Sequence, residues 1–244
     1  MSDSPIQKDD RERLVLYLIH DIEPALASFQ SLLGILKKGR FDPNNALHNN
    51  LMKSCGTAMI FARGILQDML EYARLKEGRL KTCAVSFSWD ELLQEVIAIP
   101  AALAEERSIE LIIQNEMTAG KEFLDKGLIQ RIALNLVINS IKNSPHRSRV
   151  WLRLSPDNEG VVLSIEDEGV GASEEELGRI FEESFQARPR EAGQYKGIGL
   201  GLSFCREACE LIGATISVRR RTTKGLAFDV HIPKVSKGPI ISTC

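Results

Sequence analysis

Residues 131–145, RIALNLVINSIKNSP, place polar amides inside an otherwise apolar helical pattern. Asn135 and Asn139 lie one turn apart on one face of this helix, and Lys142 and Asn143 follow on the next turn. Asparagine is a poor residue in a helix interior, and polar groups among leucines and isoleucines need partners. Two surface amides are the simpler interpretation of the asparagines taken alone. A hydrated Mg²⁺ ion with phosphates would also satisfy them, because hard cations take oxygen ligands.

Short β-branched runs surround this helix from about Lys81 onward. The runs cover residues 84–88, 109–116, 149–155, 161–169, 214–222 and 226–233. They are interleaved with helical patterns at Trp89–Glu106, Asp125–Ser144 and Leu202–Ile212. Strands and helices in this order predict an α/β or α+β layer domain, in which helices pack on a sheet.

The first third of the chain has the pattern of two long helices. Apolar residues recur at three-four spacing from Leu14 to Leu36 and again from Leu47 to Ala73. The stretch KKGRFDPNN, residues 37–45, separates them with Gly39 and Pro43. Two long helices joined by a short turn lie antiparallel. Because a single hairpin cannot cover two apolar stripes, pairing with a second copy as a four-helix bundle is expected.

Composition excludes several classes of protein. The chain has 244 residues, 43% of them hydrophobic, and a net charge of -2, so neither a nucleic acid nor an anionic membrane is expected as partner. Its longest uncharged apolar run, Val96–Ala104, is too short to span a bilayer. The polar start MSDSPIQKDD does not resemble a signal peptide, and five cysteines are an odd number. These features predict a cytoplasmic protein with reduced thiols and no membrane segment.

Three further clusters accompany the asparagine helix. SIEDEGVGA, residues 164–172, reads as a strand that ends in Asp167, and alone it is an ordinary strand-to-helix turn. RIFEESF, residues 179–185, is consistent with core aromatics. KGIGLGLSFCREACELIG, residues 196–213, places three alternating glycines before a helix. Glycine lets backbone amides approach an anion, and a helix N-terminus favours phosphate. The glycine spacing matches neither a dinucleotide-binding fingerprint nor a P-loop.

In this order the clusters resemble the sensor histidine kinases of two-component systems over nearly the whole chain. LIHDIEPAL (18–26) resembles their phosphoacceptor box, and NLVINSIKNSP resembles their asparagine box. DEGVGA, IFEESF and GIGLGL resemble the first glycine, phenylalanine and second glycine boxes. The resemblance implies an α+β chain: a helical hairpin forming a dimeric four-helix bundle, followed by an α/β sandwich ATP-binding domain of the gyrase, chaperone and histidine kinase superfamily. The expected limits are 1–80 for the dimerisation and phosphotransfer hairpin, 81–236 for the ATP-binding domain and 237–244 for a tail.

The same resemblance implies roles for individual residues. Asn139 would ligate Mg²⁺, and Asp167 would accept a hydrogen bond from the adenine amine. Asn135 and Lys142 would lie near the phosphates of ATP, and Asn143 would be a further ATP-binding residue. The other ATP-binding residues expected from the boxes are Gly169, Gly171, Phe181, Gly197, Ile198, Gly199, Leu200 and Gly201.

Asn135 also carries a meaning within the superfamily. The hydrolytic members have a glutamate one turn before the metal-binding asparagine, where it activates water. Asparagine is a poor base, so the substitution favours transfer to a protein acceptor over ATP hydrolysis.

His20 is the expected phosphoacceptor. It lies on the opposite side of its helix from Leu18 and Ile22, away from the apolar stripe. Asp21 can hold the imidazole with one ring nitrogen unprotonated and exposed. Pro24 cannot donate to the His20 carbonyl, which loosens the helix there. The usual box has proline five residues after the histidine, whereas Pro24 comes four after it and occupies the position of a water-orienting Thr or Asn.

The expected function is therefore a homodimeric histidine kinase core that autophosphorylates His20 from Mg-ATP and passes the phosphoryl group to a response regulator receiver domain. A separate sensor protein is a possible further partner. The alternative is a catalytically degenerate kinase-like protein that acts through nucleotide-dependent or dimer-dependent partner binding. A serine kinase acting as an anti-sigma factor is a third option, but it has no use for a long histidine-bearing hairpin.

Overall fold

The computed structural model describes residues 26–183, 185 and 200–234. These residues fall into two compact units, which divide between Glu71 and Tyr72. His20, Asp21 and Pro24 lie outside the described residues.

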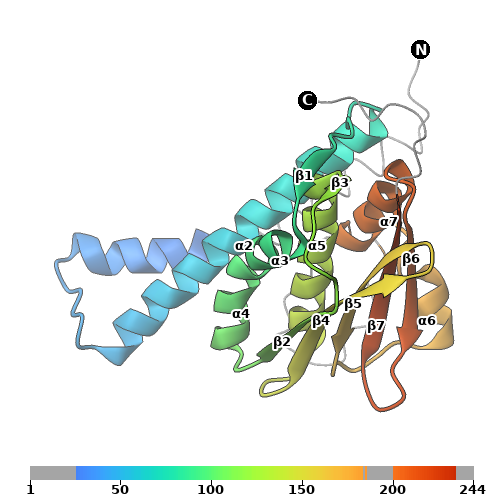
Figure 1. Ribbon diagram of the computed structural model, residues 1–244. Helices are drawn as coiled ribbons and strands as arrows, with labels where there is room; N and C mark the ends of the chain where they lie inside the picture. Colours follow the sequence, from blue (N-terminus) through green and yellow to red (C-terminus); the bar gives the residue numbers. More distant parts are fainter. Residues whose placement is uncertain (1–25, 184, 186–199, 235–244) are drawn as a thin grey trace. The chain divides into compact units, whose positions relative to one another are not determined.

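The N-terminal unit contains two helices joined by an ordered turn (Figure 1). The first covers residues 26–37, and the second, α2, covers Ala46–Lys76. Gly39 has a φ of 62° and ends the first helix by donating its amide to Leu36 O at 2.9 Å. Asn45 begins α2, since its Oδ1 accepts from Leu47 N at 2.9 Å. The turn predicted at residues 37–45 is therefore confirmed.

A five-stranded mixed sheet forms the centre of the second unit. Its strands are β2 (Glu110–Asn115), β4 (Arg149–Asp157), β5 (Gly160–Asp167), β7 (Leu226–Pro233) and β6 (Thr215–Arg220), in that spatial order. The β2–β4 pair is parallel, and the other pairs are antiparallel. A separate two-stranded sheet pairs β1 (Val85–Phe87) with β3 (Glu122–Leu124).

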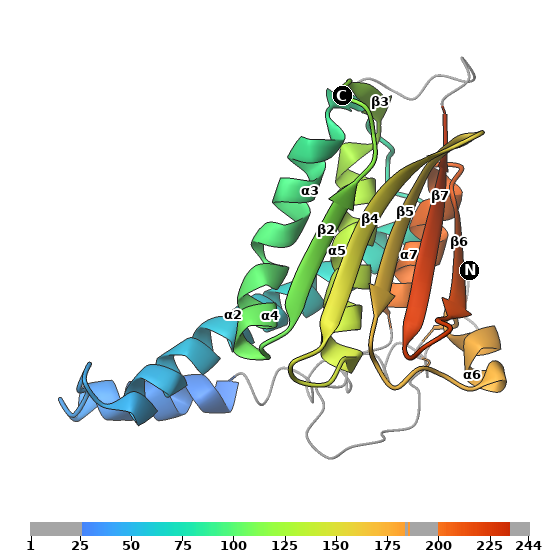
Figure 2. The same ribbon diagram turned by 60° about the horizontal axis from the view of Figure 1, so that its bottom comes forward.

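Helices cover one face of the large sheet. They are α3 (Trp89–Ala98), α4 (Pro100–Glu106), α5 (Lys126–Asn143) and α7 (Gly201–Leu211), while the short α6 (Glu174–Arg179) lies beyond the end of β5. Figure 2 shows the strands in front with α3, α5 and α7 behind them. Alternate strand residues face these helices, so Leu152, Leu163 and Phe228 are buried against Ile132 and Leu136 of α5. Together they form the core of an α/β domain.

Most of the expected elements of this domain are confirmed. The six predicted runs contain β1, β2, β4, β5, β6 and β7, and the helices at 125–144 and 202–212 are present as α5 and α7. The helix expected at 89–106 is wrong as a single element, because it divides at Pro100 into α3 and α4. Proline lacks an amide hydrogen but fits the first turn of a new helix, and Pro100 occupies that position in α4.

Two other properties bear on the sequence-based expectations. Among the described residues, none of the helices combines the length and apolar character that crossing a bilayer requires. Cys205 and Cys209 are buried and form no disulfide, as expected for small core residues, and Cys55 is buried as well.

Candidate functional site

The asparagine helix α5 supplies one wall of the site. Asp125 begins the helix by accepting Leu128 N at 2.9 Å. Near its other end, Asn143 Nδ2 donates to the carbonyl oxygen of Asn139 at 2.8 Å and to its Oδ1 at 3.1 Å. Asn135 Nδ2 is buried and has no hydrogen-bond partner within the described residues. A buried donor without a partner is costly, so this amide indicates that a ligand completes the site.

Asp167 stands at the end of β5 and is 2% exposed. Its Oδ1 accepts backbone amide hydrogens from Gly169 at 2.8 Å and Leu226 at 3.1 Å. Burial raises the pKa of this carboxyl, while the two amides and the Arg221 guanidinium act in the opposite direction. The Ser140 hydroxyl of α5 also lowers this pKa, although it makes no hydrogen bond of regular geometry. Asp167 is therefore a buried acceptor that is held by the backbone on two sides.

The glycines after Asp167 allow α5 and β5 to approach each other. A Cβ on Gly169 would lie 2.7 Å from Asp167 Oδ1 and 2.8 Å from the Asn143 carbonyl oxygen, closer than side chains pack. Gly171 has a φ of 72°, which strains other residues. The structure therefore brings Asn143, Asp167 and Gly169 together.

The start of α7 forms the third side. Leu200 is 2% exposed, and a Cβ on Gly201 would lie 3.9 Å from Asn135 Cγ. Within the part of the chain that the structure describes, no side chain caps this helix at Leu200, and a helix N-terminus of this kind suits an anion. The neighbouring α5 and α7 are held together by Arg131, whose guanidinium carbon lies 5.1 Å from the Phe204 ring centroid. Gly197, Ile198 and Gly199 lie outside the described residues.

Two predicted site residues have additional structural contacts. Phe181 packs edge-on against Phe228 of β7, with ring centroids 6.4 Å apart. The Lys142 carbonyl oxygen accepts from Arg107 Nη1 at 2.8 Å. Contact of either side chain with ATP stays a prediction.

Arg107 and Gly225, which the sequence analysis did not single out, support the backbone of the site. Arg107 holds the end of α5 through the carbonyl oxygens of Lys142 and Ser144, at 2.8 and 3.1 Å. Gly225 has a φ of 94°, and a Cβ there would overlap the Asp167 backbone carbonyl and lie 2.7 Å from its Oδ1. The stretch TKGLAF, residues 223–228, contains this glycine.

These residues fit a magnesium nucleotide better than a protein-only metal site. Among the described residues, no group of three or more His, Cys, Asp or Glu side chains could hold a metal ion. The amide oxygens of α5 suit Mg²⁺ when phosphates supply further ligands, as hard cations require. The unpartnered Asn135 amide and the uncapped start of α7 suit the phosphates themselves.

A separate cleft beside α6 and α7 has a volume of about 620 Å³. Its lining includes Glu182, Glu183, Glu207 and Glu210, together with Arg206. This surplus of negative charge would repel a triphosphate, so the cleft is a poor phosphate site.

Comparison with a protein-family model identifies the domain that contains these residues. The family described as Histidine kinase-, DNA gyrase B-, and HSP90-like ATPase matches residues 124–236. The matched segment runs from the end of β3 past β7 and includes α5, Asp167 and α7.

The chain also resembles larger sensor proteins. The Autoinducer 2 sensor kinase/phosphatase LuxQ of Vibrio cholerae is 26% identical over 227 residues, which cover 91% of this chain and 26% of LuxQ. The chain thus spans about a quarter of that relative's length.

Two solved structures share the fold. Full-length ShkA in complex with AMPPNP has a TM-score of 0.62 at 21% identity, covering 91% of this chain and 45% of ShkA. Histidine kinase ThkA in complex with response regulator protein TrrA has a TM-score of 0.59 at 19% identity, covering 96% of this chain and 68% of that chain. Residues 124–236 therefore match the family of histidine kinase-, DNA gyrase B- and HSP90-like ATPases, and the chain is similar to sensor histidine kinases.

Proposed function

We propose that this protein is the cytoplasmic core of a histidine kinase, which autophosphorylates His20 from Mg-ATP and transfers the phosphoryl group to an aspartate of a response regulator receiver domain. One observation carries the proposal. Elements distant in sequence bring Gly201 next to Asn135, and Asp167 and Gly169 next to Asn143 of the same helix, and the buried Asn135 amide has no partner within the described residues.

The two ends of this site suit the two ends of ATP. Asp167 offers a buried acceptor for the exocyclic amine of adenine, and the Gly169 and Gly171 backbone that follows it would line the base. Asn139 offers an oxygen for Mg²⁺, while Asn135, Lys142, Asn143 and the start of α7 suit the phosphates. Mg²⁺ would supply charge neutralisation, which is a large part of phosphoryl-transfer catalysis.

Asn135 supports transfer to a protein over hydrolysis, because an amide cannot take a proton from water. An imidazole nitrogen of His20 would attack the γ-phosphorus, forming an N–P bond as the bond to ADP breaks. Asp21 would orient the ring. The receiver aspartate would then attack the same phosphorus and regenerate the histidine.

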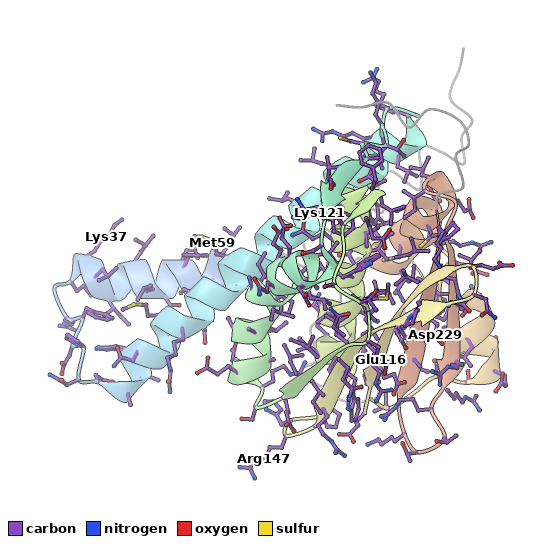
Figure 3. All side chains as sticks on the ribbon, in the orientation of Figure 1. Lys37, Met59, Glu116, Lys121, Arg147 and Asp229 are labelled. Carbon is purple, nitrogen blue, oxygen red and sulfur yellow. The ribbon has the colours of Figure 1, made fainter. Side chains whose placement is uncertain are left out.

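The hairpin supports a homodimer. Met52, Met59 and Leu66 recur every seven residues along α2 and are 46%, 56% and 46% exposed; Met59 is labelled in Figure 3. An apolar side chain every seventh residue is typical of the interface between supercoiled helices. An exposed apolar stripe of this kind is usually buried against another protein surface. We assign residues 1–80 to the dimerisation and phosphotransfer hairpin, 81–236 to the ATP-binding domain and 237–244 to a tail.

The proposed partner follows from the same class of protein. A response regulator accompanies ThkA in its solved complex, which supports a receiver domain as the acceptor here. A separate sensor protein would supply the input signal to this core.

A degenerate kinase-like protein that acts by partner binding is the second candidate. Pro24 favours it, because this proline comes four residues after His20 instead of five. The glycine and asparagine clusters favour the kinase.

Phosphorylation with γ-labelled ATP tests these alternatives. The kinase should acquire acid-labile, base-stable label, which His20→Gln should abolish while ATP binding is retained. His48→Gln is the matched control, because His48 lies in the first turn of α2, where its ring stacks on Phe41 of the preceding turn. Label that persists in His20→Gln would exclude His20 as acceptor. ATP binding without any label in the native chain would favour the degenerate alternative.

A further inference from the structure

The turn between β6 and β7 closes over Asp167. Arg221, which follows β6, donates from Nη1 to the Asp167 carbonyl oxygen at 2.9 Å. Leu226, which begins β7, donates its amide to Asp167 Oδ1 at 3.1 Å. Gly225 lies against the same peptide, where any Cβ would overlap the Asp167 carbonyl. A single turn therefore holds both the backbone and the side chain of Asp167.

Arg221 is itself fixed on the open face of the sheet. Its Nε lies 3.1 Å from Glu166 Oε2, and its Nη1 also donates to the Lys224 carbonyl oxygen at 3.2 Å. Its guanidinium carbon lies 4.3 Å from the ring centroid of Trp151, which is 8% exposed. The Arg221 side chain is 16% exposed. Stacking and several hydrogen bonds restrain a planar guanidinium in a way that an ammonium group cannot reproduce.

We propose that Arg221 is a positioning residue of the nucleotide site, which holds the Asp167 carboxylate in place for the exocyclic amine of adenine and so contributes to the preference for adenine over guanine. The inference rests on the proposed ATP-binding function. Adenine presents an amino donor where guanine presents a carbonyl acceptor, so a fixed carboxylate accepts the first base and repels the second.

The electrostatics of the site agree with this geometry. Burial raises the pKa of Asp167, and the positive charge of Arg221 lowers it. The other groups around Asp167 are the Ser140 hydroxyl of α5, Lys224 in the turn, Glu166 and Glu168 on either side of it, and Arg149 of β4 paired with Glu168 at 2.8 Å. Without Arg221, Asp167 would take up a proton at a higher pH, and a protonated carboxyl is a poorer acceptor for the amine.

Arg219, on β6 two residues before Arg221, provides a matched control. Its Nε lies 2.8 Å from Asp229 Oδ2, and its Nη2 lies 3.6 Å from Glu166 Oε1. Asp229, labelled in Figure 3, lies on β7. Arg219 therefore shares the charge of Arg221 and its pairing with Glu166, but its second ion pair is with Asp229, whereas Arg221 bonds the Asp167 carbonyl oxygen. Replacing Arg219 therefore measures how a weaker ion-pair network affects nucleotide binding, without removing a hydrogen bond to Asp167.

The experiment measures binding of ATP and GTP to the purified chain by calorimetry, from mildly acidic to neutral pH. Arg221→Gln should lower the affinity for ATP by about tenfold or more, as expected when a charged hydrogen bond is lost. The affinity for GTP should fall by less, and the pH at which half the ATP affinity is lost should rise. Arg219→Gln should retain native affinity and midpoint. Arg221→Lys should restore the midpoint through its charge but not the full affinity.

Arg221→Gln that matches Arg219→Gln in all three measurements would overturn the proposal. So would a loss that is equal for ATP and GTP with an unchanged pH midpoint, because that is the behaviour of a merely structural residue. If Arg221→Gln does not fold, the ATP affinity of Arg221→Lys tests the proposal instead. A native ATP affinity in Arg221→Lys would contradict positioning by the guanidinium. A native chain that binds neither nucleotide would instead contradict the proposed function.

Discussion

The hairpin and the ATP-binding domain place the same kinds of side chain in opposite environments. In the hairpin, Leu47 and Leu70 are 73% and 60% exposed. In the domain, Leu92, Leu136 and Leu163 are all 0% exposed. A sheet covered by helices encloses an apolar layer within one chain, whereas a pair of helices leaves most of each apolar stripe open. The domain therefore supplies its own core, whereas the described residues of the hairpin leave much of their apolar surface exposed.

Paired truncations test this contrast most directly. Leu163→Ala should lower the free energy of unfolding of the ATP-binding domain by about 2–5 kcal/mol, because it leaves a cavity in a closed core. Leu66→Ala should change stability by less than about 0.5 kcal/mol at concentrations where the chain is monomeric, since this side chain is already exposed. Urea unfolding, monitored by circular dichroism, measures the free energy of unfolding of both variants. The volume-conserving Leu163→Met should cost less than about 1.5 kcal/mol. Equal losses at both leucines would remove the contrast.

Charges on the hairpin stripe test whether a second copy covers it. Leu66→Asp with Leu70→Asp should raise the dimer dissociation constant by roughly 100-fold or more, because association would bury unpaired carboxylates. Light scattering across a concentration series gives the oligomeric state. Lys53→Asp introduces the same charge at an exposed polar position of α2 and should leave the dimer intact. A native chain that is monomeric at all concentrations would contradict the bundle.

Asp167 is an exception within the closed domain, because its burial favours the uncharged form. Its pKa is raised in the folded state, so the native chain binds more protons than the unfolded chain between the two pKa values. The free energy of unfolding should therefore fall as the pH rises through that window.

Asp167→Asn should remove this penalty and raise the Tm at neutral pH, while ATP affinity falls. Asparagine Oδ1 can still accept the amides of Gly169 and Leu226. At a pH below the pKa of an ordinary aspartate, the Tm of the native chain and the Tm of Asp167→Asn should converge. Thermal unfolding over a pH series tests this, with Asp229→Asn as the control that breaks an ion pair and gains no stability. A Tm of Asp167→Asn below that of the native chain at every pH would show that the buried carboxylate stabilises the fold, which contradicts the prediction.

The smallest expected effect concerns two buried thiols. Burial raises the pKa of Cys209 to about 12, so very little thiolate is present in the folded domain near neutral pH. Cys55 is 2% exposed but lies in the hairpin, where local opening disrupts fewer packed layers. Alkylation followed by peptide mass mapping should therefore label Cys55 before Cys209. Faster labelling of Cys209 would mean that the domain opens more readily than the hairpin.

Local patterns were enough to predict much of the domain. The asparagine helix, the strand that ends in Asp167 and the uncapped helix after the glycines are all marked by periodicity and by residue types that local conformation requires. β3 and α6 were not anticipated. β3 has three residues, too few to show a period, and depends on β1 for its hydrogen bonds. α6 is six residues long and is defined by a capping box between Ser173 and Glu176.

The sequence by itself determined the alternation of strands and helices and the kinds of group that reach the site, because both depend on neighbours a few residues apart. The support of Asp167 was decided only by the tertiary structure. Arg221 is 54 residues from Asp167 in sequence, and Leu226 is 59 residues from it. The register of β7 against β5 and the hairpin of β6 with β7 bring them together. Such contacts depend on how strands pair, and no spacing within a single segment records that pairing.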